Sequence, residues 1–175
     1  MVVLKKILDF YINSSLHVAL SAFALVSMTQ YFFGVQGDFS VAFFAFFGTV
    51  VGYNFVKYDA IARLNKTEIK KELKAIVFLS FISLLVRFYF FLQLSWDSKL
   101  SAVAFFGLTL LYTLPFFPNK QNARNWKGVK IYIVGITWVG VTVILPLVEA
   151  EIPFTMDVLL MSFQRFLLVF TIVLV

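Results

Sequence analysis

Residues 75–94 read AIVFLSFISLLVRFYFFLQL, and Arg87 is the one charged side chain among these 20 residues. A helix rises about 1.5 Å per residue, so a stretch of this length reaches about 30 Å, which is the thickness of the hydrocarbon core of a bilayer. A helix on a soluble protein would carry a polar face, and this stretch carries none. It therefore predicts a membrane-spanning helix.

Five more apolar segments of similar length surround this one. The six predicted spans cover approximately residues 13–33, 40–57, 75–94, 100–117, 131–148 and 156–175. None of them alternates polar and apolar residues as the strands of a membrane barrel do. Short connections place consecutive helices antiparallel. The sequence thus predicts an all-α integral membrane protein, a multi-span antiparallel helix bundle forming a single transmembrane helical domain over residues 1–175. Its last predicted span stays apolar to Val175, so we expect a fragment, incomplete at the C-terminus.

The overall composition agrees with a protein dissolved in lipid. Hydrophobic residues make up 61% of the 175 residues and the mean hydropathy is +0.92, more apolar surface than a soluble domain of this size can bury. The chain has no cysteine, which excludes disulfides and thiolate metal sites. One histidine and nine acidic residues leave little material for a metal site built from histidine clusters.

The basic residues predict the orientation. Twelve of the 15 lie before the first predicted span or in the loops after the second and fourth: Lys5, Lys6, Lys57, Arg63, Lys66, Lys70, Lys71, Lys74, Lys120, Arg124, Lys127 and Lys130. The opposite loops carry Lys99 together with acidic residues. By the positive-inside rule the N-terminus and both basic loops are cytoplasmic. The net charge of +6 therefore indicates membrane topology and no nucleic-acid partner, because no soluble module presents these charges.

The end of the second predicted span carries a candidate site. Asn54, Tyr58 and Ala62 are spaced by four residues and share one helix face. Carboxylates at such positions would bind Mg²⁺, which would in turn hold a diphosphate. Here the face offers one amide, one phenol and a methyl group, while Asp59 is turned about 100° away. Asn54 and Asp59 are the candidate metal ligands; the alternative is that Asn54 forms an interhelical hydrogen bond and Tyr58 anchors at the interface.

The stretch from Asn54 to Asn65 resembles the first aspartate-rich motif of the UbiA-type intramembrane prenyltransferases, Asn-Asp-x-x-Asp-x-x-x-Asp followed by Arg-Ile-Asn. Asn54 and the tail Arg63-Leu64-Asn65 match, whereas the acidic positions hold Phe55, Tyr58 and Ala62. Further along, residues 112–115 (Tyr-Thr-Leu-Pro) resemble the family's Tyr-Ser-x-Pro, and residues 125–130 with Trp138 resemble its basic loop. The resemblance covers most of the chain.

The resemblance implies a prenyl group transferred from a prenyl diphosphate to an acceptor, with Mg²⁺ as cofactor if the protein is active. It implies diphosphate-binding roles for Asn54, Arg63, Lys127 and Lys130. It also implies membrane lipid and a prenyl diphosphate as partners, and a bacterial inner membrane as the location. Because two of the carboxylate positions hold Tyr58 and Ala62, the sequence argues against ordinary catalysis and leaves it open whether the chain is an enzyme.

Two alternatives remain at this point. In the first, the chain is a non-enzymatic membrane protein that binds a lipid or a partner, and its basic residues serve only topology and anionic headgroups, worth about 1 kcal/mol each. In the second, Arg87 and Arg165, both inside predicted spans, belong to a small transporter, because an ionisable group inside a membrane is a functional candidate.

Overall fold

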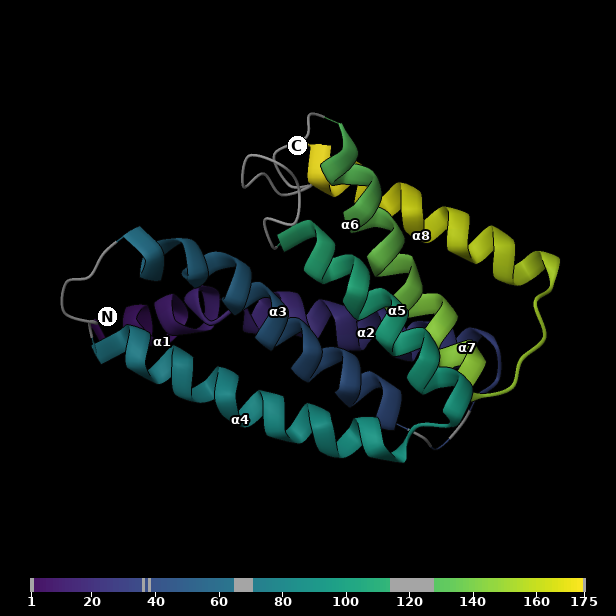
Figure 1. The fold of residues 1–175 in the computed structure, drawn as a ribbon, viewed down its shortest axis with the longest axis horizontal. Helices are drawn as coiled ribbons and strands as arrows, with labels where there is room; N and C mark the ends of the chain where they lie inside the picture. The colour runs from purple at the N-terminus through teal and green to yellow at the C-terminus, as the bar shows by residue number, and fades with distance from the viewer. Residues whose placement is uncertain (1, 36, 38, 65–70, 114–127, 175) are drawn as a thin grey trace. The chain divides into compact units, whose positions relative to one another are not determined.

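The computed structural model describes residues 2–35, 37, 39–64, 71–113 and 128–174, with the side chains of residues 2, 59–64 and 71–72 left outside the description. Every secondary-structure element of this part is helical (Figure 1), which confirms the predicted all-α class. The elements are α1 (Val2–Asn13), α2 (Leu16–Phe32), α3 (Ser40–Leu64), α4 (Lys71–Gln93), α5 (Trp96–Thr113), α6 (Val129–Val139), a π-helical segment (Gly140–Ile144), α7 (Leu145–Glu149) and α8 (Met156–Leu174).

Four helical stretches are long and apolar enough to cross a membrane. They are Ser40–Tyr58, Leu73–Gln93, Val129–Glu149, in which α6, the π-helical segment and α7 run on as one rod, and Met156–Leu174. A fifth candidate is the pair Val3–Asn13 and Leu16–Phe32, which is bent by 60°. The four stretches coincide with four of the six predicted spans, and the second helix of the bent pair covers most of the predicted span 13–33. The remaining one, residues 100–117, runs beyond Thr113 into residues that are not described.

The start of the chain differs from the prediction. The first span was expected from residue 13, but α2 begins at Leu16 and a separate helix, α1, precedes it. Ser14 and Ser15 make the turn between them; both are buried, and Ser15 has φ 59°. A non-glycine residue in this left-handed region interrupts a helix. The hydropathy pattern is continuous across the two serines, which is why it did not reveal the bend.

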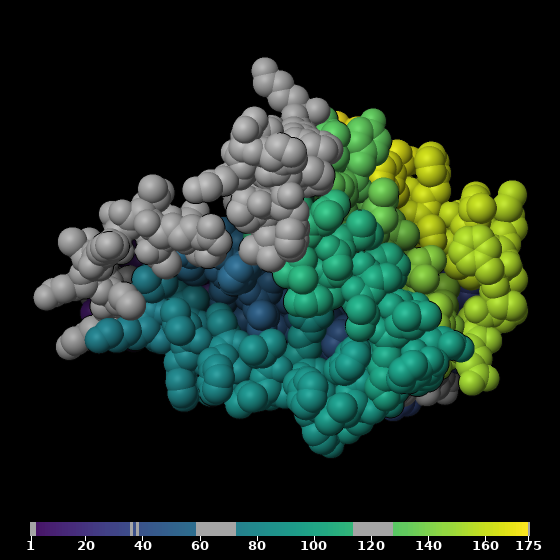
Figure 2. Space-filling model, in the orientation of Figure 1, coloured from purple at the N-terminus to yellow at the C-terminus, as the bar shows by residue number. Residues whose placement is uncertain are grey.

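The described residues form two compact units. The first comprises Met1–Leu25 and Ala42–Gln93, and the second comprises Val26–Val41 and Leu94–Val175. In the first unit, phenylalanines join α3 to α4: the Phe43 and Phe90 rings stack at 5.6 Å, and the Phe44 and Phe91 rings lie 6.2 Å apart. Many exposed side chains of α4 are large and apolar, among them Phe78, Phe81 and Phe88. Figure 2 shows the surface of α4 in blue-green. It is the type of surface that contacts lipid tails.

In the second unit, α6 packs against both α5 and α8. Two glycines of the rod allow this close approach. A Cβ at Gly135 would stand 2.7 Å from Cε2 of Phe166, and one at Gly140 would overlap the ring of Phe105. The start of α5 is held by Glu149, whose carboxylate accepts hydrogen bonds from the backbone N–H of Ser95 at 3.0 Å and from its hydroxyl at 2.9 Å.

Candidate functional site

Asn54 is buried in the first unit, at the interface of α3 and α4. Its amide Nδ2 donates to Oγ of Ser80 at 2.9 Å, and that hydroxyl donates in turn to the Ile76 carbonyl at 2.8 Å. The amide oxygen, Oδ1, is buried and accepts no hydrogen bond from the described residues. Asn54 thus makes the interhelical bond of the simpler interpretation while keeping the one atom that could bind a cation.

The next position on that face, Tyr58, is committed to helix packing. Its hydroxyl donates to the Asn13 carbonyl at 2.8 Å, and Nζ of Lys57 donates to the same carbonyl at 3.3 Å. Asn13 is the last residue of α1, so its carbonyl has no partner within the helix. The two side chains of α3 supply that partner and tie the end of α1 to the end of a helical stretch that is long and apolar enough to cross a membrane.

Of the other residues predicted for this site, only Lys130 has a described side chain. Asp59 and Arg63 belong to α3, but their side chains fall outside the described part, and Lys127 falls outside it altogether. Lys130 is exposed in the first turn of α6, in the second unit, whereas Asn54 belongs to the first. The predicted diphosphate-binding set therefore stays a prediction.

The described side chains of the α3 face do not complete a magnesium site by themselves, and the side chain of Asp59, the other predicted ligand, lies outside the description. Mg²⁺ requires six oxygens in near-ideal octahedral geometry and is bound through carboxylates. On this face the described side chains offer one free amide oxygen, and the phenol is already engaged. Among the residues whose side chains are described, no three histidines or acids gather as a metal-binding group.

A second polar cluster lies inside the second unit, and we call it the arginine cluster: Thr29, Thr142 and Arg165. The Thr29 hydroxyl donates to the Thr142 carbonyl at 2.7 Å and accepts from Nη2 of Arg165 at 3.3 Å. All three residues are buried. Arg165 is the tenth residue of the 19 in α8, so the cluster sits at mid-helix. Among the described residues, this guanidinium thus donates to a hydroxyl and not to a carboxylate.

Pro146 explains why the Thr142 carbonyl needs a partner. A proline has no N–H, so the carbonyl four residues before it loses its α-helical hydrogen bond. The π-helical segment Gly140–Ile144 contains Thr142 and ends two residues before Pro146, and π-bulges are frequent at functional sites. Sequence reasoning identified Arg165 but missed Thr29 and Thr142. The spacing between Thr142 and Pro146 was the signal for the open carbonyl, whereas nothing local indicates Thr29, which is 113 residues away.

One atom of the arginine cluster lacks a partner. Nη1 of Arg165 is buried and donates to no group among the described residues. A guanidinium inside a bilayer costs several kcal/mol unless it is paired or faces a cavity, so this unpaired donor is a costly one.

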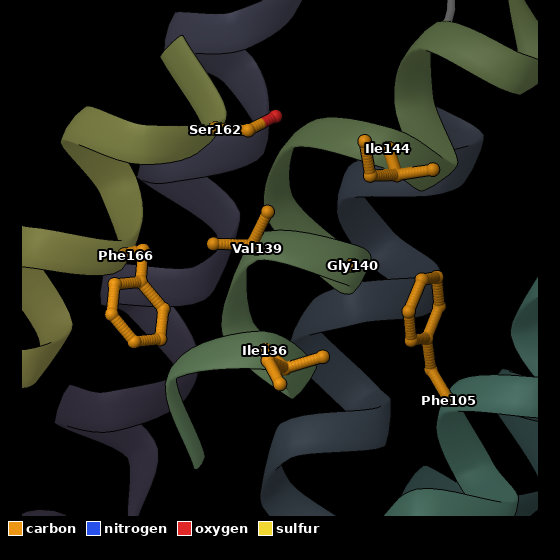
Figure 3. A pocket seen from close by; sticks show the side chains of 7 residues that line it. All are labelled: Phe105, Ile136, Val139, Gly140, Ile144, Ser162 and Phe166. Carbon is orange, nitrogen blue, oxygen red and sulfur yellow. The ribbon is translucent and has the colours of Figure 1, made fainter. Parts of the chain in front are cut away.

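A shallow pocket of about 190 Å³ lies along the rod, between residues of α5 and α8 (Figure 3). Its lining is apolar apart from one hydroxyl: Phe105, Ile136, Val139, Gly140, Ile144, Ser162 and Phe166. Ser162 and Phe166 flank Arg165 on α8. Ligand pockets usually measure about 300–1,000 Å³, so this one suits a segment of an alkyl chain and is too small for a whole ligand.

Arg87 occupies a specific place in the first unit. Its guanidinium lies over the Phe44 ring, with Cζ 4.9 Å from the centroid. Gly48 makes room for it, because a Cβ there would approach Nε of Arg87 to 3.3 Å. A cation over an aromatic face is stabilised by about 0.5–2 kcal/mol, more when desolvated. This packing gives Arg87 an aromatic partner within the predicted span.

Comparison with protein-family models, with curated proteins and with solved structures found no match to this chain.

Proposed function

We propose that the protein is a UbiA-like prenyltransferase homologue that binds a prenyl diphosphate at the end of α3 and has lost ordinary metal-dependent transfer. The observation that carries this proposal is Asn54, whose buried Oδ1 is left open while its Nδ2 is used by Ser80. An open acceptor in a membrane interior is costly, and a cation or a protonated ligand group would satisfy it.

The basic side chains of the sequence supply the rest of the proposed site. A diphosphate needs positive charge, and Arg and Lys provide it where no metal does. Arg63 follows Asn54 on α3, and we assign it to the diphosphate; Lys127 and Lys130 stay candidates on the basic pattern of the sequence alone. The positive-inside pattern supports a cytoplasmic N-terminus, and we propose the bacterial inner membrane as the location and six spans as the count.

The direct test measures binding of geranyl diphosphate to the purified full-length protein with and without Mg²⁺. We expect binding in both conditions, without release of free diphosphate in the presence of candidate aromatic acceptors. Asn54→Ala should weaken binding. Ser80→Ala is the matched control, because it removes the partner of Nδ2 and leaves Oδ1 in place. Absence of binding in both conditions would sink the proposal.

A rebuilt motif gives the sharper test. Tyr58→Asp combined with Ala62→Asp would place two carboxylates on the face of Asn54, and we expect binding to become dependent on Mg²⁺ by about tenfold or more, equivalent to ~1.4 kcal/mol. Tyr58→Phe is the control, since it also loses the hydrogen bond to Asn13 but adds no charge. Unchanged metal dependence in the rebuilt protein would show that this face does not meet the diphosphate.

A second candidate function is a non-enzymatic membrane protein that binds lipid or a partner. The hydrogen bonds from Asn54 to Ser80 and from Tyr58 to Asn13 favour it, because the helix face that carries Asn54 and Tyr58 then serves to join α3 to α4 and α1. Under this alternative, geranyl diphosphate does not bind, and Asn54→Ala lowers stability without any change in ligand binding.

A further inference from the structure

Helix α1 has two chemically different faces. Lys5, Lys6, Asp9 and Asn13 fall within an arc of about 100° when residues advance by 100° each. The opposite side carries large apolar side chains that no described residue covers: Val3 is 71% exposed, Leu4 73%, Ile7 61% and Leu8 53%. This much uncovered apolar surface on 12 residues requires a covering partner.

The depth of α1 follows from its attachment to α3. Ser40–Tyr58 is long and apolar enough to cross a membrane, and the side chains at its polar end, Lys57 and Tyr58, donate to the Asn13 carbonyl. The last residue of α1 therefore lies at the level where this span leaves the hydrocarbon.

The direction of α1 follows from the bend. It departs from α2 by 60°, and the turn is ordered by the backbone hydrogen bonds from Ser14 N to the Phe10 carbonyl at 2.8 Å and from Ala19 N to the Ser15 carbonyl at 3.1 Å. The 17 residues of α2 reach about 25 Å at 1.5 Å per residue, close to the full hydrocarbon thickness, so α2 does not need α1 to cross.

We propose that α1 is an in-plane membrane helix whose apolar face enters the lipid interface and whose lysines bind anionic headgroups. The charge pattern favours an anionic lipid surface: Lys5 and Lys6 outnumber Asp9 on the polar face. A basic residue at such a surface contributes about 1 kcal/mol, and an amphipathic helix inserts its apolar face about 5–10 Å into the headgroup boundary. Through Asn13, this helix sets the depth of the α3 end.

The depth test uses the full-length protein, whose lack of cysteine allows single-site spin labels. Leu4→Cys and Leu8→Cys mark the apolar face, Lys6→Cys and Asp9→Cys the polar face, and Leu85→Cys on α4 gives a reference deep in a span. We expect equal shallow depths at Leu4 and Leu8, with high oxygen accessibility, and high accessibility to a water-soluble nickel reagent at Lys6 and Asp9. A depth change of about 6 Å between Leu4 and Leu8, the rise of four residues, would overturn the proposal in favour of a broken span. Protection of both faces from both reagents would overturn it in favour of a protein partner.

A second experiment varies the lipid composition and tests whether the lysines of α1 bind anionic headgroups. In vesicles containing phosphatidylglycerol, the Leu8→Cys label should lie deeper than in pure phosphatidylcholine, and salt should reverse the shift. Lys5→Gln with Lys6→Gln should abolish the difference, whereas Lys99→Gln on α5 should preserve it. Equal label depth in the two lipids would overturn the anionic-lipid assignment.

Discussion

Three buried polar residues, Asn54, Thr29 and Arg165, each use one atom to join helices. Nδ2 of Asn54 reaches Ser80, and the Thr29 hydroxyl serves both the Thr142 carbonyl and Nη2 of Arg165. Hydrogen bonds between membrane helices contribute about 0.6–2 kcal/mol each. Oδ1 of Asn54 and Nη1 of Arg165 are left without a partner among the described residues. A ligand that formed a hydrogen bond to either atom would remove the cost of burying it unpaired.

Thr29→Val should destabilise the protein by about 1–3 kcal/mol, because it leaves the Thr142 carbonyl and the Arg165 guanidinium without the hydroxyl. SDS-driven unfolding in mixed micelles measures the loss. Thr137→Val is the matched control, since that hydroxyl bonds only within its own helix, to the Ile133 carbonyl at 2.8 Å; its effect should stay within about 0.5 kcal/mol.

Arg165→Met should be neutral or stabilising, because replacing a buried charge by an apolar side chain of similar length removes a desolvation cost. In that background Thr29→Val should cost less than in the wild type, since only the carbonyl is then left open. The same unfolding measurement completes the double-mutant cycle. Equal costs of Thr29→Val in both backgrounds would contradict the coupling between the two residues.

At the scale of elements, the rod from Val129 to Glu149 shows how a helix accommodates an interruption. Pro146 removes one backbone donor. The residues before it form a π-helical turn, and the hydroxyl of Thr29 donates to the Thr142 carbonyl in place of the missing N–H. Gly135 and Gly140 expose the backbone of the rod to the rings of Phe166 and Phe105. Small residues of this kind let membrane helices approach closely.

Gly140→Ala should destabilise the protein by about 1–3 kcal/mol, because the new methyl group overlaps the Phe105 ring in a packed interior. Phe105→Leu should recover part of the loss by making room. Gly107→Ala on α5 is the control, because a Cβ there meets no atom within 4 Å. If Gly140→Ala were as harmless as Gly107→Ala in SDS unfolding, the close approach of α5 to the rod would be refuted.

At the scale of the whole molecule, the charge pattern and the helix order predict the side of the membrane on which each loop lies. Single cysteines in the otherwise cysteine-free chain at Asp97 and Glu151 should react with an impermeant maleimide outside intact cells. Cysteines at Lys5 and Lys130 should react only after permeabilisation. Labelling of Asp97→Cys and Lys130→Cys from the same side would show that α5 does not cross.

Much of the architecture was predictable because hydropathy is a local property that adds along a helix. Residues 75–94 predicted a span, and α4, at Lys71–Gln93, contains a stretch long and apolar enough to cross a membrane. Hydropathy could not reveal the turn at Ser14 and Ser15, since its cause is backbone conformation. The candidate residues were likewise predictable only in part. Residue type pointed to Asn54 and Arg165, whereas only the fold identified Ser80 and Thr29 as their partners.

The amino-acid sequence by itself determined that the chain is helical and rich in apolar segments that suit a bilayer, because burying polar backbone in lipid leaves few alternatives to a helix. Tertiary structure alone decided which polar atoms are paired. Thr29 lies 136 residues from Arg165, and Asn54 lies 26 residues from Ser80. Contacts of this kind depend on helix rotation and packing, which residue type does not encode locally. They show that the face of Asn54 and Tyr58 joins helices and keeps one open oxygen.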